Sequence, residues 1–444
     1  MRIPVADAAR ATGARLVGAD SVTCDGVSYD SRSLNAGNLF VAIVAARDGH
    51  DFVADAARAG CAAVLVSREV PDCPVPQIVV ADTSVALTEL GRWARGRLAG
   101  RVDGRVVGIT GSVGKTTTKD YVAAALRTHF NVGASEKSLN NDQGMPVTLL
   151  NAPDDADALV LEMGMRGFGE IARLAVLARP DIGVVTRVGE SHGERVGGID
   201  GVARAKGELV ESLPSTGIAI LNADDPRVAA MAALTDARVF TYGAAENADM
   251  RFFDVVQDGS DGVGFRFTSR WGSGECRLPT PGAHMVSNAA AALLVAAVTD
   301  CDLTAAAAAL GHSQLSPMRM AVHRVGDLTI IDDSYNASPT SVIAALDAMA
   351  SMPGKRRVAV LGLMAEIADE AAMHRAVASH AAKLGIDVVS VGTDLYGGRR
   401  LDDPADVVAM VRNLPGGSVV LFKASRVVGL DRIVTDLVTP NIGT

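Results

Sequence analysis

The fold of this chain is decided by the stretch Val106-Val-Gly-Ile-Thr-Gly-Ser-Val-Gly-Lys-Thr116. Its first five residues are typical of a buried strand, and residues 117–126 after it are typical of a helix. A strand that enters a glycine loop and then a helix directs backbone N–H groups and a helix N-terminus at one point, which binds phosphate. In such a loop Lys115 contacts the outer phosphates and Thr116 binds Mg²⁺. The stretch therefore predicts a site for a nucleoside triphosphate.

The spacing of this loop departs from the usual pattern G-x-x-x-x-G-K-[ST]. Counting back from Gly114, the first glycine should stand at position 109, where the chain has Ile109, and Gly108 is one residue away. The alternative is a tight glycine turn that carries a surface lysine. The strand–loop–helix context and Thr116 favour the phosphate loop.

Length and composition are typical of a large globular protein. The 444 residues suffice for about three domains, and 48% hydrophobic with 21% charged residues predicts a full core. A net charge of −9 and a pI of about 5.4 argue against a general binder of nucleic acids or anionic membranes. The five cysteines are scattered and form no C-x-x-C pair, so neither a disulfide framework nor a zinc site is predicted.

Two features bear on the location of the protein. Charged residues (Arg2, Asp7, Arg10 and Arg15) occupy the first fifteen positions, so no secretory apolar segment is expected. The most apolar run, residues 289–299, is too short to span a bilayer. We therefore expect a cytoplasmic protein without membrane insertion and without a nucleic-acid partner.

The order of apolar runs predicts an α/β protein of three domains, bounded at 1–100, 101–314 and 315–444. The first is a small α/β unit with strands at 39–43 and 62–66 and a helix at 52–59. The central phosphate-loop domain has a parallel sheet, and the third is Rossmann-like but lacks a G-x-G-x-x-G fingerprint. The central domain has predicted strands at 106–110, 158–163, 182–187 and 218–222, antiparallel strands within 243–281, and helices at 286–298 and 303–310. The third has predicted strands at 328–332, 358–361, 388–391 and 418–422.

Two residues at strand ends are candidate metal ligands. Glu162 lies at the end of one central strand and His192 just past the next. Ligands collect at the carboxyl ends of parallel strands, and Mg²⁺ usually takes one or two protein ligands plus substrate oxygens. Either residue alone could cap a helix or be a satisfied polar residue. Together with the phosphate loop they predict a second Mg²⁺ site.

Lys206 lies on the apolar face of a predicted helix. Val202, Lys206, Leu209 and Leu213 are spaced as one helix face. The lysine could extend its ammonium to water. It could instead be desolvated, with a lowered pKa, and a neutral amine can take up CO₂ to become an anionic carbamate.

Asn140 and Asn141 precede a glycine and a proline. Asparagines in this setting could be turn formers. They could also donate hydrogen bonds to a substrate phosphate or sugar.

The chain resembles the Mur ligases, which build the peptide of bacterial cell-wall precursors, in eleven ordered segments that cover nearly its full length. The segments are residues 30–32, 48–52, 110–118, 140–146, 161–164, 189–192, 205–208, 282–288, 318–319, 332–339 and 423–426. Within the family, the Tyr335-Asn336 pair and the form of residues 205–208 are most similar to the member that adds D-alanyl-D-alanine to UDP-N-acetylmuramoyl-tripeptide. The resemblance implies an ATP-dependent amide ligase with a UDP-binding first domain. A monomer is expected, although the sequence itself does not determine the oligomeric state.

The resemblance also implies a role for each matching residue. Lys115, Lys206, His192 and Arg319 are the implied catalytic residues, and Lys206 is implied to be carbamylated. ATP would be held by Gly111, Ser112, Val113, Gly114, Lys115, Thr116, Thr117, Asn288, Arg319 and Asp333. Mg²⁺ would be held by Thr116, Glu162 and His192. Substrate would contact Ser31, Arg32 and His50 near the uridine nucleotide, Asn140, Asn141, Tyr335 and Asn336, and Lys423, Ser425 and Arg426 near the dipeptide.

Three positions depart from the family pattern. Val113 stands where asparagine is common, Met285 replaces an asparagine after the histidine, and Leu363 stands where an acidic residue is usual. The last weakens the transfer of the dipeptide site. The third residue of the tripeptide, meso-diaminopimelate or L-lysine, stays open.

Three other functions compete with this interpretation. A folylpolyglutamate synthase-like ligase would lack a UDP-binding domain with residues 30–32. A non-catalytic ATP-gated binding protein is favoured only by Met285 and Leu363. Lys206 together with Glu162 and His192 argues against it. A phosphoryl-transferring kinase would need a hydroxyl acceptor and would leave the peptide product unexplained.

Overall fold

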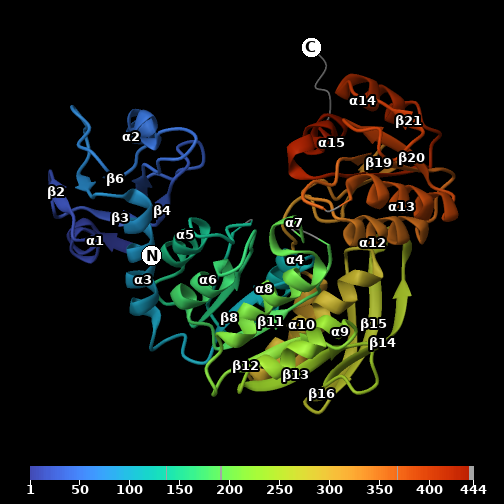
Figure 1. Cartoon of the computed structure of the whole chain (residues 1–444), viewed down its shortest axis with the longest axis horizontal. Helices are drawn as coiled ribbons and strands as arrows, with labels where there is room; N and C mark the ends of the chain where they lie inside the picture. The colour runs from blue at the N-terminus through green and yellow to red at the C-terminus, as the bar shows by residue number, and fades with distance from the viewer. Residues whose placement is uncertain (137, 191–192, 368, 440–444) are drawn as a thin grey trace.

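The computed structural model of the chain describes residues 1–136, 138–190, 193–367 and 369–439. Three α/β units follow one another along the chain, and the central unit joins the other two (Figure 1). The predicted three-domain α/β architecture is confirmed. The boundaries near residues 100 and 315 remain a proposal.

The first unit is built on a sheet in the order β2-β7-β6-β5-β4, in which β2 alone is antiparallel to its described neighbour. Its strands are β2 (Arg15–Val17), β4 (Val27–Ser28), β5 (Leu39–Val41), β6 (Ala63–Val66) and β7 (Gln77–Val79), and β1 (Arg2–Pro4) pairs separately with β3 (Thr23–Asp25). The helices are α1 (Val5–Thr12), η1 (Gly49–Phe52), α2 (Val53–Arg58) and α3 (Thr83–Leu98). The two predicted strands are confirmed with ends shifted by up to two residues, and the predicted helix is divided between η1 and α2.

The central unit carries the large sheet, in the order β16-β15-β14-β13-β12-β11-β8-β10-β9. Its strands are β8 (Val106–Thr110), β9 (Val132–Ala134), β10 (Ala158–Glu162), β11 (Ile182–Val185), β12 (Ile218–Asn222), β13 (Arg238–Gly243), β14 (Met250–Gln257), β15 (Val263–Ser269) and β16 (Gly272–Leu278). The strands from β9 to β14 are parallel, and β14, β15 and β16 are joined as antiparallel neighbours. The predicted parallel sheet and its antiparallel extension are both confirmed.

Helices cover both faces of this sheet because the apolar side chains of its strands alternate between two cores. Val107 and Ile109 of β8 belong to one core, whereas Val106 belongs to the other. On the first face lie α4 (Lys115–Leu126), α10 (Ala283–Val298) and α11 (Leu303–Gly311), and on the second lie α5 (Gly144–Asn151), α6 (Glu170–Ala178) and α8 (Ile199–Glu211). Shorter helices are α7 (Gly193–Val196), α9 (Pro226–Ala229), η2 (Ala230–Leu234) and η3 (Gly259–Asp261).

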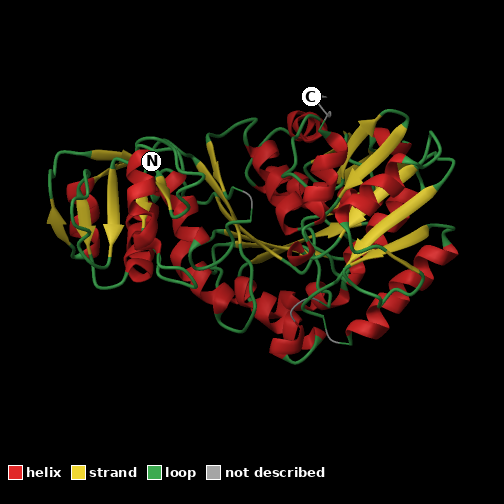
Figure 2. Ribbon diagram, turned by 90° about the horizontal axis from the view of Figure 1, so that it is seen from above, coloured by secondary structure: helices red, strands yellow, loops and turns green. Residues whose placement is uncertain are grey.

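The third unit has a sheet in the order β17-β18-β22-β19-β20-β21. The strands are β17 (Ala321–Val325), β18 (Leu328–Asp332), β19 (Arg357–Gly362), β20 (Asp387–Val391), β21 (Arg399–Arg400) and β22 (Val419–Lys423), all parallel except β17. Helices α12 (Pro339–Ala350) and α13 (Glu370–Lys383) pack on one face, and α14 (Pro404–Arg412) and α15 (Leu430–Val438) on the other, with η4 (Arg426–Val428) before α15. Figure 2 shows these strands lying between helices.

One hydrophobic core continues from the first unit into the central unit. Helix α3 packs on α5 and α6, and Leu87 and Leu90 share a fully buried cluster with Leu149 and Leu150. The helices approach closely, since a Cβ atom placed on Gly91 would lie 2.9 Å from Cβ of Pro146. The first unit is therefore seated firmly on the central one.

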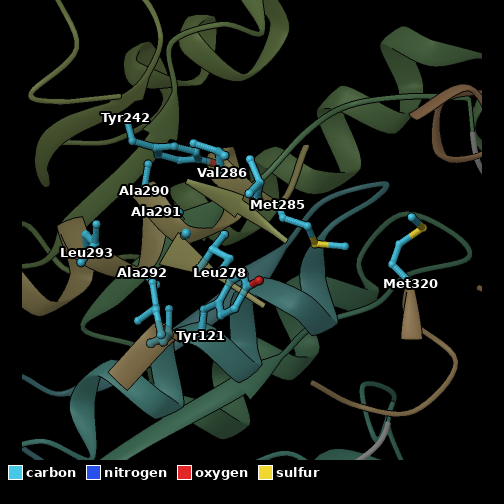
Figure 3. Close-up of a cluster of buried hydrophobic side chains, with 14 of the residues drawn as sticks. Tyr121, Tyr242, Leu278, Met285, Val286, Ala290, Ala291, Ala292, Leu293 and Met320 are labelled. Carbon is cyan, nitrogen blue, oxygen red and sulfur yellow. The ribbon is translucent and has the colours of Figure 1, made fainter. Parts of the chain in front are cut away.

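Helix α10 forms the centre of the other core. Ala290, Ala291 and Ala292 lie on it in the same core as Tyr121 of α4 and Tyr242 of β13, and α10 packs against α4 (Figure 3). A helix that is apolar on all sides must be buried within protein or lipid. Among the described helices, none has both the length and the apolarity needed to cross a membrane.

Candidate active site

A cleft of about 710 Å³ lies where the central and third units meet. The central unit lines it with the phosphate loop and the ends of β10 and β11, together with side chains of α8 and α10. The third unit adds residues that precede and begin α12, and Lys423 at the end of β22. The cleft therefore lies at the carboxyl ends of parallel strands from two sheets, where open α/β folds bind ligands.

The phosphate loop adopts the predicted strand–loop–helix form. Strand β8 ends at Thr110, and Gly114 caps α4 in the left-handed conformation with a φ of 84°. A Cβ atom on Gly111 would lie 1.9 Å from Oγ1 of Thr186, so the loop accepts only glycine there. Thr186 Oγ1 also donates to the carbonyl oxygen of Val113 over 2.6 Å and holds the loop in shape.

Lys115 is half-buried in the cleft and does not extend from the protein surface. Its Nζ donates to the carbonyl oxygen of Gly111 over 2.8 Å, a local bond that a phosphate oxygen can replace. Burial lowers the pKa of Lys115, and the nearby charge of Glu162 opposes that effect. The alternative of a surface lysine on a tight turn is therefore wrong.

Glu162 and Thr116 form a buried polar pair at the base of the cleft. Thr116 Oγ1 donates to Glu162 Oε2 over 2.8 Å, and Asn140 Nδ2 donates to Glu162 Oε1 over 2.7 Å. Glu162 is 1% exposed, and its carboxylate has no cationic hydrogen-bond partner among the described residues. A carboxylate and a hydroxyl are oxygen ligands that suit Mg²⁺.

The third predicted metal ligand, His192, lies outside the described residues. Within the described residues, no group of three or more His, Cys, Asp or Glu side chains could hold a metal ion. The pair of Thr116 and Glu162 is therefore the described part of this predicted site.

Lys206 is buried, as its place on the apolar helix face predicts. It is 2% exposed, it lines the cleft, and Val202 and Leu209 on the same face of α8 are fully buried. Its pKa lies well below the ordinary value, because burial disfavours the ammonium and the charge of Lys115 adds repulsion. The alternative in which the ammonium reaches water is wrong. The buried amine therefore lines the cleft in surroundings that disfavour its charged form.

Arg319, in the segment between α11 and β17, links the third unit to the phosphate loop. Its Nη2 donates to Thr116 Oγ1 over 3.0 Å, and its guanidinium lies 4.2 Å from the ring centroid of Tyr335. Met318 and Met320, on either side of it, have φ values of 60° and 54°. Non-glycine residues rarely adopt this conformation, which is characteristic of strained functional segments.

Asp333 and Lys423 form a buried ion pair on the third unit. Lys423 Nζ donates to Asp333 Oδ2 and to the carbonyl oxygen of Asn336, the latter over 2.9 Å. The backbone N–H of Met320 donates to the other oxygen of Asp333 over 3.2 Å. Both predicted residues line the cleft and are already paired with each other.

Asn288 of α10 is the central residue of the predicted adenine contact. Its Oδ1 accepts from Thr118 Oγ1 over 3.3 Å, and a Cβ atom on Gly114 would lie 2.5 Å from that oxygen. One turn earlier in α10, burial lowers the pKa of His284 to about 4, so this side chain is neutral at physiological pH. Met285, which departs from the family pattern, is buried in the core and extends toward the side of Met320 in Figure 3.

The cleft brings together most of the predicted site residues. Those that line it are Ser112, Val113, Gly114, Lys115, Thr116, Thr117, Asn140, Asn141, Glu162, Lys206, Asn288, Arg319, Asp333, Tyr335, Asn336 and Lys423. Gly111, Ser425 and Arg426 are not among its lining residues, and Ser31, Arg32 and His50 lie in the first unit.

The predicted uridine residues are held by contacts within the first unit. His50 is buried, its Nε2 accepts from the backbone N–H of Ser67 over 2.9 Å, and its Nδ1 is bonded to Asp48 over 2.6 Å. Arg32 forms two bonds to Asp30, over 2.9 and 2.7 Å. Both ring nitrogens of His50 are therefore engaged, and the side chain joins the segment around Asp48 to Ser67.

Several cleft residues were not predicted from the sequence, and three of them stand out by their position. Thr186 shapes the phosphate loop, while Arg166 and Arg187 line the cleft with exposed side chains. All three follow or end strands β10 and β11 closely, so position at a carboxyl strand end is the signal that could have found them.

Two family models match most of the chain. The Mur ligase middle domain matches residues 109–296, and the glutamate ligase domain of Mur ligases matches residues 318–440. The chain is also 36% identical over 423 residues to the UDP-N-acetylmuramoyl-tripeptide–D-alanyl-D-alanine ligase of Escherichia coli (strain K12), with 92% of each chain covered.

Solved structures agree with this similarity along the whole chain. The MurF structure from Acinetobacter baumannii has a TM-score of 0.86, 28% identity and 99% coverage of both chains. The MurF ligase from Thermotoga maritima, in complex with ADP, has a TM-score of 0.77 and 27% identity, over 92% of this chain and 96% of that one. With its phosphate loop, its three α/β units and these matches, the chain belongs to the Mur ligase family.

Proposed function

We propose that this protein is an ATP-dependent ligase that joins D-alanyl-D-alanine to UDP-N-acetylmuramoyl-tripeptide in peptidoglycan precursor synthesis. The observation that carries the proposal is the meeting, in one cleft, of a phosphate loop, a buried carboxylate, a buried lysine and an arginine from beyond the central unit. A relative with that name is 36% identical over 92% of the chain, which includes most of the first unit and supports it further.

The reaction consists of two displacements. A carboxylate oxygen of the tripeptide attacks the γ-phosphorus of ATP, the bond to the bridging oxygen breaks, and ADP leaves. The amine of D-alanyl-D-alanine then attacks the carbonyl carbon of the acyl phosphate. The tetrahedral intermediate expels phosphate, and the nitrogen loses its proton to leave an amide. No side-chain nucleophile is required, so positioning and charge stabilisation carry the catalysis.

The first displacement brings two anions together. At about 4 Å, each pair of unit charges repels by about 4 kcal/mol at an effective dielectric constant of 20. Lys115 and Arg319 face the same end of the phosphate loop and offset this repulsion, since Arg319 already reaches Thr116 Oγ1 over 3.0 Å. Asn288 and Asp333 line the same cleft, and we assign them to the adenosine.

The donor set fits Mg²⁺ and a carbamate. Thr116 and Glu162, with His192, would hold Mg²⁺, which neutralises the charge of the transferred phosphoryl group. Burial lowers the pKa of Lys206 and so favours the neutral amine, the form that binds CO₂, and the resulting carbamate would supply a negative oxygen ligand beside the cleft. Both groups belong to the proposal.

The substrate-binding residues are distributed over all three units. The uridine nucleotide is assigned to Ser31, Arg32 and His50. The peptide of the UDP-linked substrate is assigned to Asn140, Asn141, Tyr335 and Asn336. The incoming dipeptide is assigned to Lys423, Ser425 and Arg426. Because these groups lie on separate units, we expect the units to close around the substrates and exclude water. A cytoplasmic monomer is part of the same proposal.

The test measures amide formation and phosphate release together. Purified protein receives ATP, Mg²⁺, the UDP-linked tripeptide and D-alanyl-D-alanine, and mass spectrometry identifies the product. Phosphate should appear only when the UDP-linked tripeptide and D-alanyl-D-alanine are both present. Its amount should equal that of the new amide. Phosphate without amide, or a preference for single amino acids over the dipeptide, would overturn the assignment.

A further inference from the structure

Most basic side chains of the described cleft are already committed. Lys115 donates to Gly111, Arg319 to Thr116 and Lys423 to Asp333, while Lys206 is buried and its pKa is lowered by that burial. Arg166 and Arg187 differ from these. Both are exposed on the cleft wall, and no described residue accepts a hydrogen bond from either guanidinium.

Arg187 is held rigidly beside the phosphate loop. Its carbonyl oxygen accepts from the backbone N–H of Ser112 over 2.6 Å. On one side, Thr186 Oγ1 donates to the loop, and on the other the backbone N–H of Val188 donates to Asp225 Oδ2 over 2.9 Å. Gly189 exchanges two bonds of 2.9 Å with the Ser112 side chain. The backbone on both sides of Arg187 is therefore held in place, and the position of its Cα atom relative to the phosphate loop is fixed.

The same segment also reaches the third unit. A Cβ atom on Gly189 would lie 3.3 Å from Oγ1 of Thr340, in the first turn of α12. Arg166 lies on a different wall, in the loop between β10 and α6, where its backbone N–H donates to Glu170 Oε2 over 2.6 Å. Arg187 is therefore the free cation that lies between the phosphate loop and the third unit, among the described residues.

The residues proposed above to contact the dipeptide are already engaged with groups of the protein, so its carboxylate gains from a further cation. The dipeptide carries a carboxylate that the reaction does not consume. Lys423 is paired with Asp333, Arg426 with Asp431 over 3.0 Å, and Ser425 Oγ accepts from the backbone N–H of Ala365 over 2.8 Å. An unpaired anion in a cleft would cost free energy, and a guanidinium binds a carboxylate through two parallel bonds.

We propose that Arg187 binds the free carboxylate of the amine-bearing substrate and thereby sets the specificity for a dipeptide with a free C-terminal carboxylate. The assignment rests on the proposed ligase function. The guanidinium anchors the end of the dipeptide that does not react, and its amine is then directed at the carbonyl carbon of the acyl phosphate. Arg187 is thus a binding residue that differs in task from Lys115 and Arg319, which face the triphosphate.

The experiment compares D-alanyl-D-alanine with its C-terminal amide, D-alanyl-D-alaninamide, as acceptors. In the unaltered protein, we expect kcat/KM to favour the acid by about tenfold to a hundredfold, the range for a charged hydrogen bond. Arg187→Ala should raise KM for the acid by a similar factor and accept acid and amide equally well, while KM for ATP is unchanged. Arg187→Lys should restore part of the preference. Arg127→Ala, which removes an exposed arginine outside the cleft, should keep the full preference.

Other outcomes overturn the assignment in distinct ways. A preference for the acid that survives Arg187→Ala shows that another group binds the carboxylate. A rise in KM for ATP alone shows that Arg187 binds a phosphate oxygen, and a rise in KM for the UDP-linked tripeptide alone places the residue on the other substrate. If the unaltered protein forms no amide from either acceptor, the proposed ligase function fails, independently of Arg187.

Discussion

Replacing Asn140 by aspartate should make the stability of the central unit depend steeply on pH. Asn140 Nδ2 lies 2.7 Å from Glu162 Oε1, and Glu162 is 1% exposed. In Asn140→Asp two carboxylate oxygens would face each other over this distance. Two unit charges there repel by about 6 kcal/mol at an effective dielectric constant of 20. A shared proton removes the repulsion, so the folded state binds a proton that the unfolded state releases above about pH 4.

The sign of the pH effect follows from this shared proton. Because the folded state binds more protons, the stability of Asn140→Asp falls as pH rises, by about 1.4 kcal/mol per pH unit until the repulsion is reached. Between pH 5.5 and pH 8 the loss is about 3 kcal/mol, or about 6–12 °C in melting temperature for a unit of this size. Asn140→Leu, which removes the same hydrogen bond without adding charge, should show no such slope.

The measurement is thermal unfolding followed by the fluorescence of Trp93 and Trp271, with and without Mg²⁺. Equal slopes for the two variants would refute the contact between Asn140 and Glu162. Recovery of Asn140→Asp by Mg²⁺ at pH 8 is expected, because a divalent cation between two carboxylates neutralises them. If Mg²⁺ stabilises neither variant, Glu162 is not a metal ligand.

Four further predictions concern the same cleft. Lys206→Met should raise the free energy of unfolding at pH 7, because burial lowers the pKa of the native amine. In urea melts this gain should shrink as the pH approaches about 10.4, the pKa of lysine in the unfolded chain. A gain that stays constant with pH would contradict the lowered pKa. The Lys206→Ala variant should have no activity in the ligase assay, and a short carboxylic acid should restore part of that activity. Full activity of this variant without added acid would exclude the carbamate. Lys115→Ala should abolish ATP-dependent phosphate release, and retained turnover would remove the phosphate-loop premise. Gly114→Ala should weaken ATP binding about tenfold or more in calorimetry, because its Cβ atom would lie 2.5 Å from Asn288 and its φ is 84°, while Gly100→Ala, which meets no atom within 4 Å, should bind normally.

The buried strands of the sheets could be predicted because their signal is local. Strands β8, β12 and β18 begin and end where the apolar runs do, since a strand covered on both faces is apolar at nearly every position. The same reasoning found Lys206, because a single lysine on an apolar helix face is visible in the sequence. Helix α3 was not predicted, although the same periodicity could have found it. Its buried residues Leu87, Leu90, Ala94 and Leu98 are at helical spacing.

The pairings within the cleft could not be predicted from a single sequence. Lys423 and Asp333 are separated by 90 positions, and Arg319 and Thr116 by 203. Whether two such groups meet depends on how the units are seated, which no local pattern records. The same holds for His50, whose neighbours Asp48 and Ser67 engage both ring nitrogens only once the sheet of the first unit has formed.

The continuous core beneath α3 constrains any attempt to divide this protein. A shortened chain that begins near residue 101 would keep the phosphate loop, yet would present Leu149, Leu150 and Leu174 to water where α3 had covered them. Each leucine side chain so exposed costs about 1.5–3 kcal/mol, and a newly bared apolar patch promotes aggregation. The nucleotide-binding part therefore depends on its leading segment for solubility as well as for substrate, and truncation cannot separate the two roles.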